Sequence, residues 1–136
     1  MVDVSAKPVQ HREAVAQGEI QLQEPTLNLI QSHAIAKGNV LASARLAGIL
    51  AAKKTGELIP LCHPLPLTHC EVEFEMPAGE TRIIIRARVK THASTGVEME
   101  ALTAVSIAAL TIYDMCKAAD KTMQVSNIQL ISKRKS

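Results

Sequence analysis

The sequence predicts an α+β domain in which two helices cover one face of an antiparallel sheet. Two segments alternate apolar and charged residues at every second position, as half-buried strands do. Two longer segments repeat apolar residues at helical spacing, and the main elements follow the order strand, helix, strand, strand, helix, strand. Because 136 residues suit one hydrophobic core, we expect residues 1–136 to form a single domain.

The first half of the chain predicts one strand and two helices. Glu13–Leu22 alternates loosely, which favours a strand. Pro25 suits the first turn of a short helix, Thr26–His33, because a first turn leaves its amide hydrogens unpaired. Gly38–Thr55 has apolar residues at helical spacing, and Asn39 is a suitable N-cap for this second helix.

The next segment predicts a stiff loop followed by a β-hairpin. Leu58–Leu67 contains three prolines, which exclude a regular helix or a central strand. Cys70–Met76 and Thr81–Thr91 alternate as strands do, with turn residues between them. Antiparallel pairing would bring acidic side chains of the first strand near basic side chains of the second. These are Glu71, Glu73 and Glu75, and Arg82, Arg86 and Lys90.

A long helix, Val97–Asp120, and a final strand, Met123–Ile131, complete the ferredoxin-like split βαβ pattern. The helix would be about 35 Å long, and its middle, Ala101–Ile112, contains no charged residue. Because such a helix is hard to bury within one small domain, the sequence also favours an oligomer. We expect the basic tail, Lys133–Ser136, to be loose.

Composition argues against several classes of protein. Lys and Arg number 15 against 13 Asp and Glu, and the chain has one Phe, one Tyr and no Trp. We therefore expect no nucleic-acid binding. No apolar run reaches the roughly 18 residues of a membrane span. Three cysteines without a Cys-x-x-Cys pair favour neither disulfides nor a metal site. These features predict a cytoplasmic protein.

The long helix carries candidate chemical groups at both ends. Asp114 and Lys117 share a helix face, which suits either a proton-transfer pair or an ordinary exposed ion pair. Glu98 and Glu100 lie near the helix start, where acidic side chains also simply stabilise the helix dipole. About 21 Å of helix separates Glu100 from Asp114. The two ends therefore serve separate roles or sites, unless two subunits bring opposite ends together.

The proline-stiffened loop contains a second candidate group. His63, between Cys62 and Pro64, could bind phosphate or transfer protons, or it could only hydrogen-bond within the loop. Adjacent Cys and His do not have the spacing of zinc ligands, so a buried structural role is favoured for Cys62.

Basic residues form a third candidate group. Lys37 directly precedes the start of a predicted helix, where a phosphate would also meet free backbone amides. For any single member of the group, a solvated surface side chain is the favoured interpretation. The group consists of Arg12, Lys37, Lys53, Lys54, Lys117 and Lys133.

Five segments distributed along the chain indicate a known family, and the resemblance extends over nearly the whole chain. They are Met1–Ser5, Ala47–Lys53, Leu58–Leu65, Thr95–Ala104 and Ala108–Ala118. These segments resemble cyclic pyranopterin monophosphate synthase, the second enzyme of molybdenum cofactor biosynthesis. The resemblance implies a ferredoxin-like hexamer, a trimer of dimers with sites at the dimer interfaces. It also implies a lyase that converts 3′,8-cyclo-7,8-dihydroguanosine 5′-triphosphate into cyclic pyranopterin monophosphate and pyrophosphate.

The resemblance assigns roles to individual residues. It implies that Asp114 is the catalytic acid/base and that Lys117 is its partner. No metal or other cofactor is expected. Substrate would contact Leu61, Cys62, His63, Glu98, Met99 and Glu100, and its triphosphate would face Arg12, Lys37, Lys53 and Lys133.

Two departures from the family pattern keep an alternative open. The chain has Lys37-Gly38-Asn39 where the family commonly has Lys-Gly-Asp. It ends at Ser136, where the family usually continues into a Gly-Gly-Lys-Ser-Gly loop. The alternative is a non-catalytic, oligomeric nucleotide-binding relative that keeps the fold.

Overall fold

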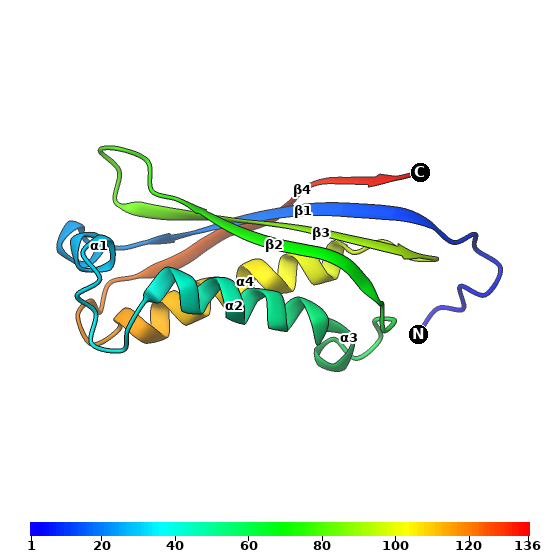
Figure 1. Cartoon of the computed structure of the whole chain (residues 1–136), viewed down its shortest axis with the longest axis horizontal. Helices are drawn as coiled ribbons and strands as arrows, with labels where there is room; N and C mark the ends of the chain where they lie inside the picture. The colour runs from blue at the N-terminus through cyan, green and yellow to red at the C-terminus, as the bar shows by residue number, and fades with distance from the viewer.

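The computed structural model describes residues 1–136, which form a four-stranded antiparallel sheet with helices on one of its faces (Figure 1). The strands are β1 (Gln10–Gln21), β2 (Leu67–Glu75), β3 (Arg82–Ala93) and β4 (Gln124–Lys135). Their spatial order is β2-β3-β1-β4, with the first and third strands in the centre. This is the ferredoxin-like arrangement, so the predicted fold class is confirmed.

The central strand β1 fixes the register of the sheet because it pairs with both β3 and β4. Its pairing with β3 is uninterrupted, from Gln10 opposite Ala93 to Gln21 opposite Arg82. The pairing with β4 has two register shifts, and Asn127, next to one of them, has a positive φ of 55°. Such irregularities are common on edge strands.

Four helices connect the strands: α1 (Glu24–Gln31), α2 (Val40–Lys53), α3 (Thr55–Leu58) and α4 (Glu98–Cys116). α2 begins after the predicted N-cap, since the side-chain oxygen of Asn39 accepts a hydrogen bond from the amide of Ala42 at 3.1 Å. Gly38, just before it, has a φ of +114°, which favours glycine. α4 ends at Cys116, four residues before the predicted Asp120.

The core lies between the sheet and the layer formed by α2 and α4 (Figure 1). Gly48 of α2 packs closely against α4. A Cβ at this position would be 2.9 Å from the carbonyl oxygen of Ala104 and 3.2 Å from a methyl group of Val72. The helices can pack this closely because small residues line the facing surface of α4, namely Ala101, Ala104 and Ala108.

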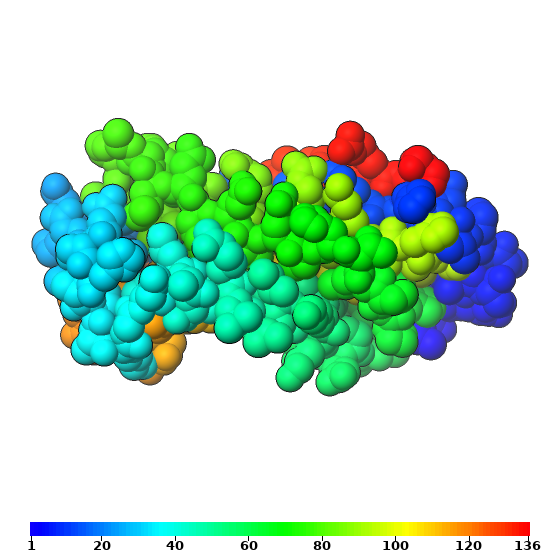
Figure 2. All heavy atoms as spheres, viewed as in Figure 1, coloured from blue at the N-terminus to red at the C-terminus, as the bar shows by residue number.

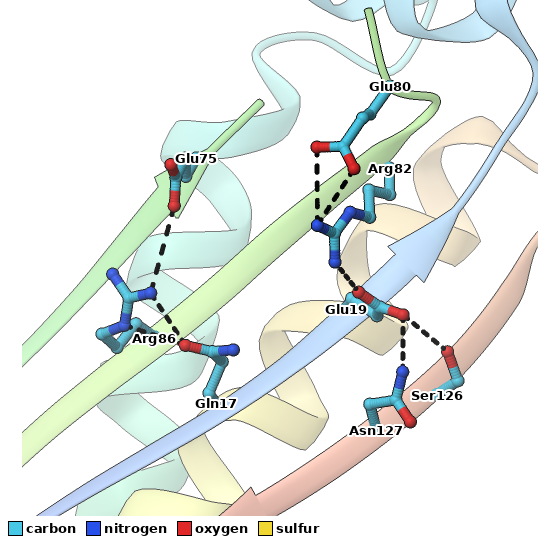
Figure 3. A network of polar contacts seen from close by, with 8 residues as sticks. All are labelled: Gln17, Glu19, Glu75, Glu80, Arg82, Arg86, Ser126 and Asn127. Atoms are coloured by element: carbon cyan, nitrogen blue, oxygen red, sulfur yellow. Dashed lines mark hydrogen bonds and ion pairs between the residues drawn. The ribbon is translucent and has the colours of Figure 1, made fainter. Parts of the chain in front are cut away.

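The other face of the sheet is not covered by helices and carries a network of polar contacts (Figure 3). Glu19 is nearly buried and accepts hydrogen bonds from Arg82 and Asn127, each at 2.6 Å. Arg86 donates to Gln17 at 2.8 Å and lies 4.0 Å from a carboxylate oxygen of Glu75. Together these contacts link all four strands of the sheet.

The predicted charge pairing between β2 and β3 is correct only in part. The register places Arg88, which was not predicted, opposite Glu71, and the two side chains lie 3.3 Å apart. Arg82 and Lys90 instead contact acidic residues of β1, which flanks β3 on its other side. The prediction considered only the pairing of β2 with β3. It fails in part because β3 is a central strand, with acidic side chains on the strands on both sides of it.

The C-terminal residues that were expected to be loose continue β4, so that prediction is wrong. Lys133 lies opposite Ala14 and Lys135 opposite Arg12. The amide of Ser136 donates to the carbonyl oxygen of His11 at 3.0 Å. β1 begins early enough to pair with these residues although none of them is apolar. Figure 2 shows the C-terminal residues in red against N-terminal residues in blue at one end of the molecule.

By length and composition alone, α4 is apolar enough to cross a membrane, with a mean hydropathy of 1.3. Within the fold, 44% of that apolar stretch is buried inside the protein. The long core helix of a water-soluble protein meets the same criterion, so α4 by itself does not indicate a membrane protein.

Candidate functional site

The antiparallel packing of α2 and α4 divides the predicted site residues between the two ends of this helix pair (Figure 1). Lys37 precedes α2 and therefore lies beside the end of α4. Lys53 is the last residue of α2, at the end where α4 begins, and it is exposed. We name the predicted site residues around the start of α4 the first cluster. They are Leu61, Cys62, His63, Glu98, Met99 and Glu100, with Arg12 and Lys133 next to them. The second cluster, around its end, consists of Lys37, Asp114 and Lys117.

The first cluster surrounds a cavity of about 260 Å³ between the proline-containing loop and the first turn of α4. His63 is held by the N-terminal segment, because its Nε2 lies 2.7 Å from the carbonyl oxygen of Val2. Of the alternatives that the sequence left open for His63, a hydrogen bond only within the loop is not what the structure shows, because this contact is with a distant segment. The predicted residues that line this cavity are Leu61, Cys62, His63, Glu98, Met99 and Glu100.

Glu100 is the most unusual acid in the first cluster, because it is only 3% exposed and forms no ion pair. Burial raises the pKa of its carboxyl group, and the nearby charge of Glu98 raises it further. Burial, together with the charge of Glu100, also raises the pKa of the Cys62 thiol. Glu100 is therefore more than an exposed acid at a helix start, and it could exchange a proton with a ligand in the cavity.

A second, smaller cavity of about 190 Å³ adjoins the first and shares Gly96 and Glu98 with it. Lys133 lies in this cavity, with its Nζ 3.3 Å from the Glu98 carboxylate. Arg12 also lines it and donates to the carbonyl oxygen of Ser94 at 3.1 Å, which braces the loop leading into α4. The first cluster thus has an acidic and apolar part and, next to it, a basic part.

A larger cavity, about 440 Å³, opens at the same end of the sheet but contains only one predicted site residue, Arg12. Its charges are already largely paired. The carboxylate of Glu13 lies 2.5 Å from Arg88, 2.8 Å from Arg134 and 3.8 Å from Lys90. We therefore assign the candidate site to the two smaller cavities and to the second cluster.

In the second cluster, two ammonium groups hold one carboxylate. Asp114 Oδ1 lies 3.1 Å from Lys117 Nζ, and Asp114 Oδ2 lies 3.0 Å from Lys37 Nζ. Lys37 also donates to the backbone carbonyl oxygen of Asp114 at 3.1 Å, a group that the end of the helix leaves unpaired. The sequence predicted the contact with Lys117 but not the one with Lys37, which is 77 positions away.

The electrostatics of the second cluster keep Asp114 ionised. Hydrogen bonds from Lys37 and then Lys117 lower the pKa of its carboxyl group. The side chains of Lys37, Asp114 and Lys117 are 49%, 58% and 56% exposed, so the ion pairs add little stability, but a ligand can reach all three groups. Tyr113, the neighbouring residue, is half-buried and packs against the core.

Asp120 is a buried acid near the second cluster that sequence reasoning missed, because it was assigned to the last turn of the long helix. It is 2% exposed, and its carboxylate accepts hydrogen bonds from Gln23, Thr26 and Thr122. The only local signal is the Asp itself, because Asp side chains often accept a hydrogen bond from the backbone amide two positions later, here that of Thr122.

No group of three His, Cys, Asp or Glu side chains in the structure is arranged to hold a metal ion. The three cysteines are free, and Cys116 is fully buried in the core. The charged side chains at the candidate site are suited to binding anions and transferring protons.

Comparison with known proteins gives a match along the whole chain. The model of the MoaC family matches residues 1–136. The chain belongs to the MoaC family. It is 59% identical over 133 residues to the cyclic pyranopterin monophosphate synthase of Thermomicrobium roseum, covering 98% of this chain and 80% of that protein. It is 60% identical over 134 residues to the protein of the same name from Chloroflexus aurantiacus, covering 98% and 82%.

A third MoaC-family relative, from Heliobacterium modesticaldum, carries the same name and is 58% identical over 133 residues, or 98% of this chain and 84% of the relative. The family resemblance seen in the sequence is confirmed. The prediction of an enzyme is confirmed as well, because these relatives are all named as synthases. The non-catalytic alternative is disfavoured accordingly.

Proposed function

We propose that this chain converts 3′,8-cyclo-7,8-dihydroguanosine 5′-triphosphate into cyclic pyranopterin monophosphate, with release of pyrophosphate, in molybdenum cofactor biosynthesis. The observation that carries the proposal is the placement of Asp114 between Lys37 and Lys117 in a MoaC-family chain. The cavity containing His63 and Glu100 supplies a place for the ring system of the substrate.

The second cluster suits the proton transfers of this reaction. Opening the guanine-derived ring and closing a pterin ring require protons to be removed and returned several times. Asp114 begins ionised, because its lysine partners lower the pKa of its carboxyl group, so it acts first as the base. Lys117, 3.1 Å away, is the proton donor of the pair.

The basic residues suit the phosphate chemistry. Forming the cyclic phosphate expels pyrophosphate, and cationic side chains stabilise the charge that develops on this leaving group. Arg12 and Lys133 line the smaller cavity, next to the cavity proposed for the ring system. Lys53, the last residue of α2, lies at the same end of the helix pair. We assign triphosphate binding to these three residues together with Lys37. We propose that no metal ion is needed to fold or hold the site.

A complete site is proposed to need two subunits. About 21 Å of helix separates Glu100 from Asp114 in one chain, too far for both to act at one bond. A two-fold dimer would place the start of one α4 near the end of the other. We propose a homo-oligomer of this kind, a hexamer built as a trimer of dimers, in which residues 1–136 form one domain per subunit and which works in the cytoplasm.

The activity is tested by incubating the purified protein with the cyclic triphosphate and measuring pyrophosphate and a pterin product. Asp114→Asn is expected to abolish turnover without altering the oligomer, whereas Lys121→Gln, which changes an exposed charge nearby, should leave turnover unchanged. Absence of product from the wild-type protein would refute the proposed reaction, and full activity of Asp114→Asn would refute the role of Asp114.

The two-subunit site is tested by co-expressing two inactive variants, Asp114→Asn and His63→Ala, in equal amounts. If each site combines both clusters from different subunits, mixed dimers contain one intact site, and about a quarter of the wild-type turnover returns. If each site lies within one chain, no turnover returns. A monomer in size-exclusion chromatography at assay concentration would also contradict the proposal.

A further inference from the structure

Asp120 lies in the turn that follows α4 and connects two distant segments of the chain. Its Oδ2 accepts hydrogen bonds from the amide of Gln23 and the hydroxyl group of Thr26, both at 2.9 Å. Its Oδ1 accepts hydrogen bonds from the amide and hydroxyl group of Thr122, at 2.8 and 2.7 Å. Four donors thus surround one carboxylate that is only 2% exposed.

Asp120 forms no ion pair, so neutral donors alone stabilise its charge. Burial by itself would raise the pKa of this carboxyl group, but the hydrogen bonds from Gln23, Thr122 and Thr26 outweigh burial and lower the pKa to about 2. Two of the donors are backbone amides and a third is the buried hydroxyl group of Thr26, so three of the four are held in place by the fold; the fourth is the hydroxyl group of Thr122, an exposed residue.

The two segments that Asp120 connects are those that supply the second cluster. Gln23 and Thr26 belong to the start of α1, and the chain continues from α1 through Lys37 into α2. Asp114 and Lys117 lie on the other segment, six and three residues before Asp120. The ion pairs of the cluster are half exposed and weak, so they cannot by themselves hold these segments together.

We propose that Asp120 is a positioning residue that fixes the start of α1 against the end of α4 and so keeps Lys37 and Lys117 in contact with Asp114. The role of this contact in turnover rests on the proposed function, but the contact itself does not. Asp120 is too deeply buried to meet substrate, so it acts only through the three residues of the second cluster.

The main test compares Asp120→Asn with a matched control, Glu19→Gln. Both changes replace a nearly buried, hydrogen-bonded carboxylate by an amide, but Glu19 lies on the uncovered face of the sheet and contacts Arg82 and Asn127 (Figure 3). Asp120→Asn is expected to lower kcat by roughly tenfold or more, because small misplacements of reacting groups are costly, with a smaller effect on KM. The control should keep kcat within about twofold even where it lowers the melting temperature equally.

A second readout does not depend on turnover. The pKa of the Asp114 carboxyl group is measured by ¹³C NMR in the wild type and in each variant. Loss of the lysine contacts in Asp120→Asn should move this pKa upward, toward its ordinary value. Removing the charge of Asp120 without any movement would instead shift the Asp114 pKa slightly downward, so the sign separates positioning from simple electrostatics. Glu19→Gln should leave it unchanged.

A milder pair of variants covers the possibility that Asp120→Asn fails to fold. Thr26→Val removes one of the four hydrogen bonds and Thr26→Ser keeps it, so only the first should raise the Asp114 pKa and lower kcat. An Asp114 pKa that does not rise in any folded variant lacking these bonds overturns the proposal, as does an equal loss of kcat in the Glu19 control. A wild-type protein without turnover refutes the proposed function alone, because the NMR measurement still decides the role of Asp120.

Discussion

Replacing Asp120 with asparagine is expected to destabilise the protein at neutral pH and to have little effect on stability in strong acid. At neutral pH the wild-type carboxylate accepts four hydrogen bonds. An amide accepts through its oxygen only, and its NH₂ group would face donors. In strong acid the protonated carboxyl group of Asp120 carries a donor of its own, as the amide of asparagine does. The wild type therefore loses the stabilisation that its carboxylate provides, and the difference in stability between the two proteins becomes small.

The size of this effect follows from the pKa of Asp120. The carboxyl group titrates at 3.8 ordinarily and at about 2 in the fold. At 1.36 kcal/mol for each pKa unit, the ionised form stabilises the fold by about 2 kcal/mol. Because the folded-state pKa is the lower one, this stabilisation is complete above pH 3.8 and is lost as the pH falls through the folded value, about 2.

The measurement is urea unfolding of the wild type and of Asp120→Asn at pH 7, 4 and 2.5, at one protein concentration because association contributes to stability. The difference in the free energy of unfolding should be about 2 kcal/mol at pH 7 and should shrink at the lowest pH. A difference that stays the same at all three pH values would show that Asp120 stabilises the fold by packing alone, and the reasoning from its hydrogen bonds would be refuted.

Three further predictions concern the helix pair and the two clusters. Gly48→Val should lower the free energy of unfolding by about 1–3 kcal/mol in urea, because its side chain would overlap a rigid backbone carbonyl; unchanged stability would mean that α2 and α4 separate freely. Lys37→Met should raise the Asp114 pKa measured by NMR, since Lys37 is the main cause of its depression, whereas Lys54→Met should have no effect. Glu100→Gln should raise the melting temperature at pH 8 while lowering turnover, because burial makes the ionised carboxylate unfavourable above its raised pKa; a lower melting temperature would contradict this explanation.

The sequence predicted the main strands and helices because their apolar residues repeat with the periods that two-layer packing requires. The predictions that were wrong concern segments whose structure depends on hydrogen bonds to a distant part of the chain rather than on the spacing of their apolar residues. Nothing apolar marks Lys133–Lys135 as a strand, yet β1 offers its backbone groups there and β4 continues. In the same way Asp120 follows α4 without a change of pattern, and its turn is set by donors from a segment 97 positions away.

The family resemblance predicts the candidate site residue by residue, but it does not predict the geometry of the site. Lys37 and Asp114 meet only because α2 and α4 run in opposite directions, which no local pattern reveals. The burial of Glu100, by contrast with the exposure of Asp114, depends on how the proline-containing loop covers the start of α4. The catalytic and binding roles of these residues stay predictions until the variants are assayed.

The scarcity of aromatic residues gives this protein a built-in optical probe. Tyr113 is the only tyrosine, the chain has no tryptophan, and Tyr113 directly precedes Asp114 on α4. Tyrosine emission therefore comes from this one turn of the helix alone, and its response to ligand or pH can be followed without labelling. A tryptophan introduced near the start of α4 could then report on the other end separately, so that the arrival of a ligand at each end could be timed in the same sample.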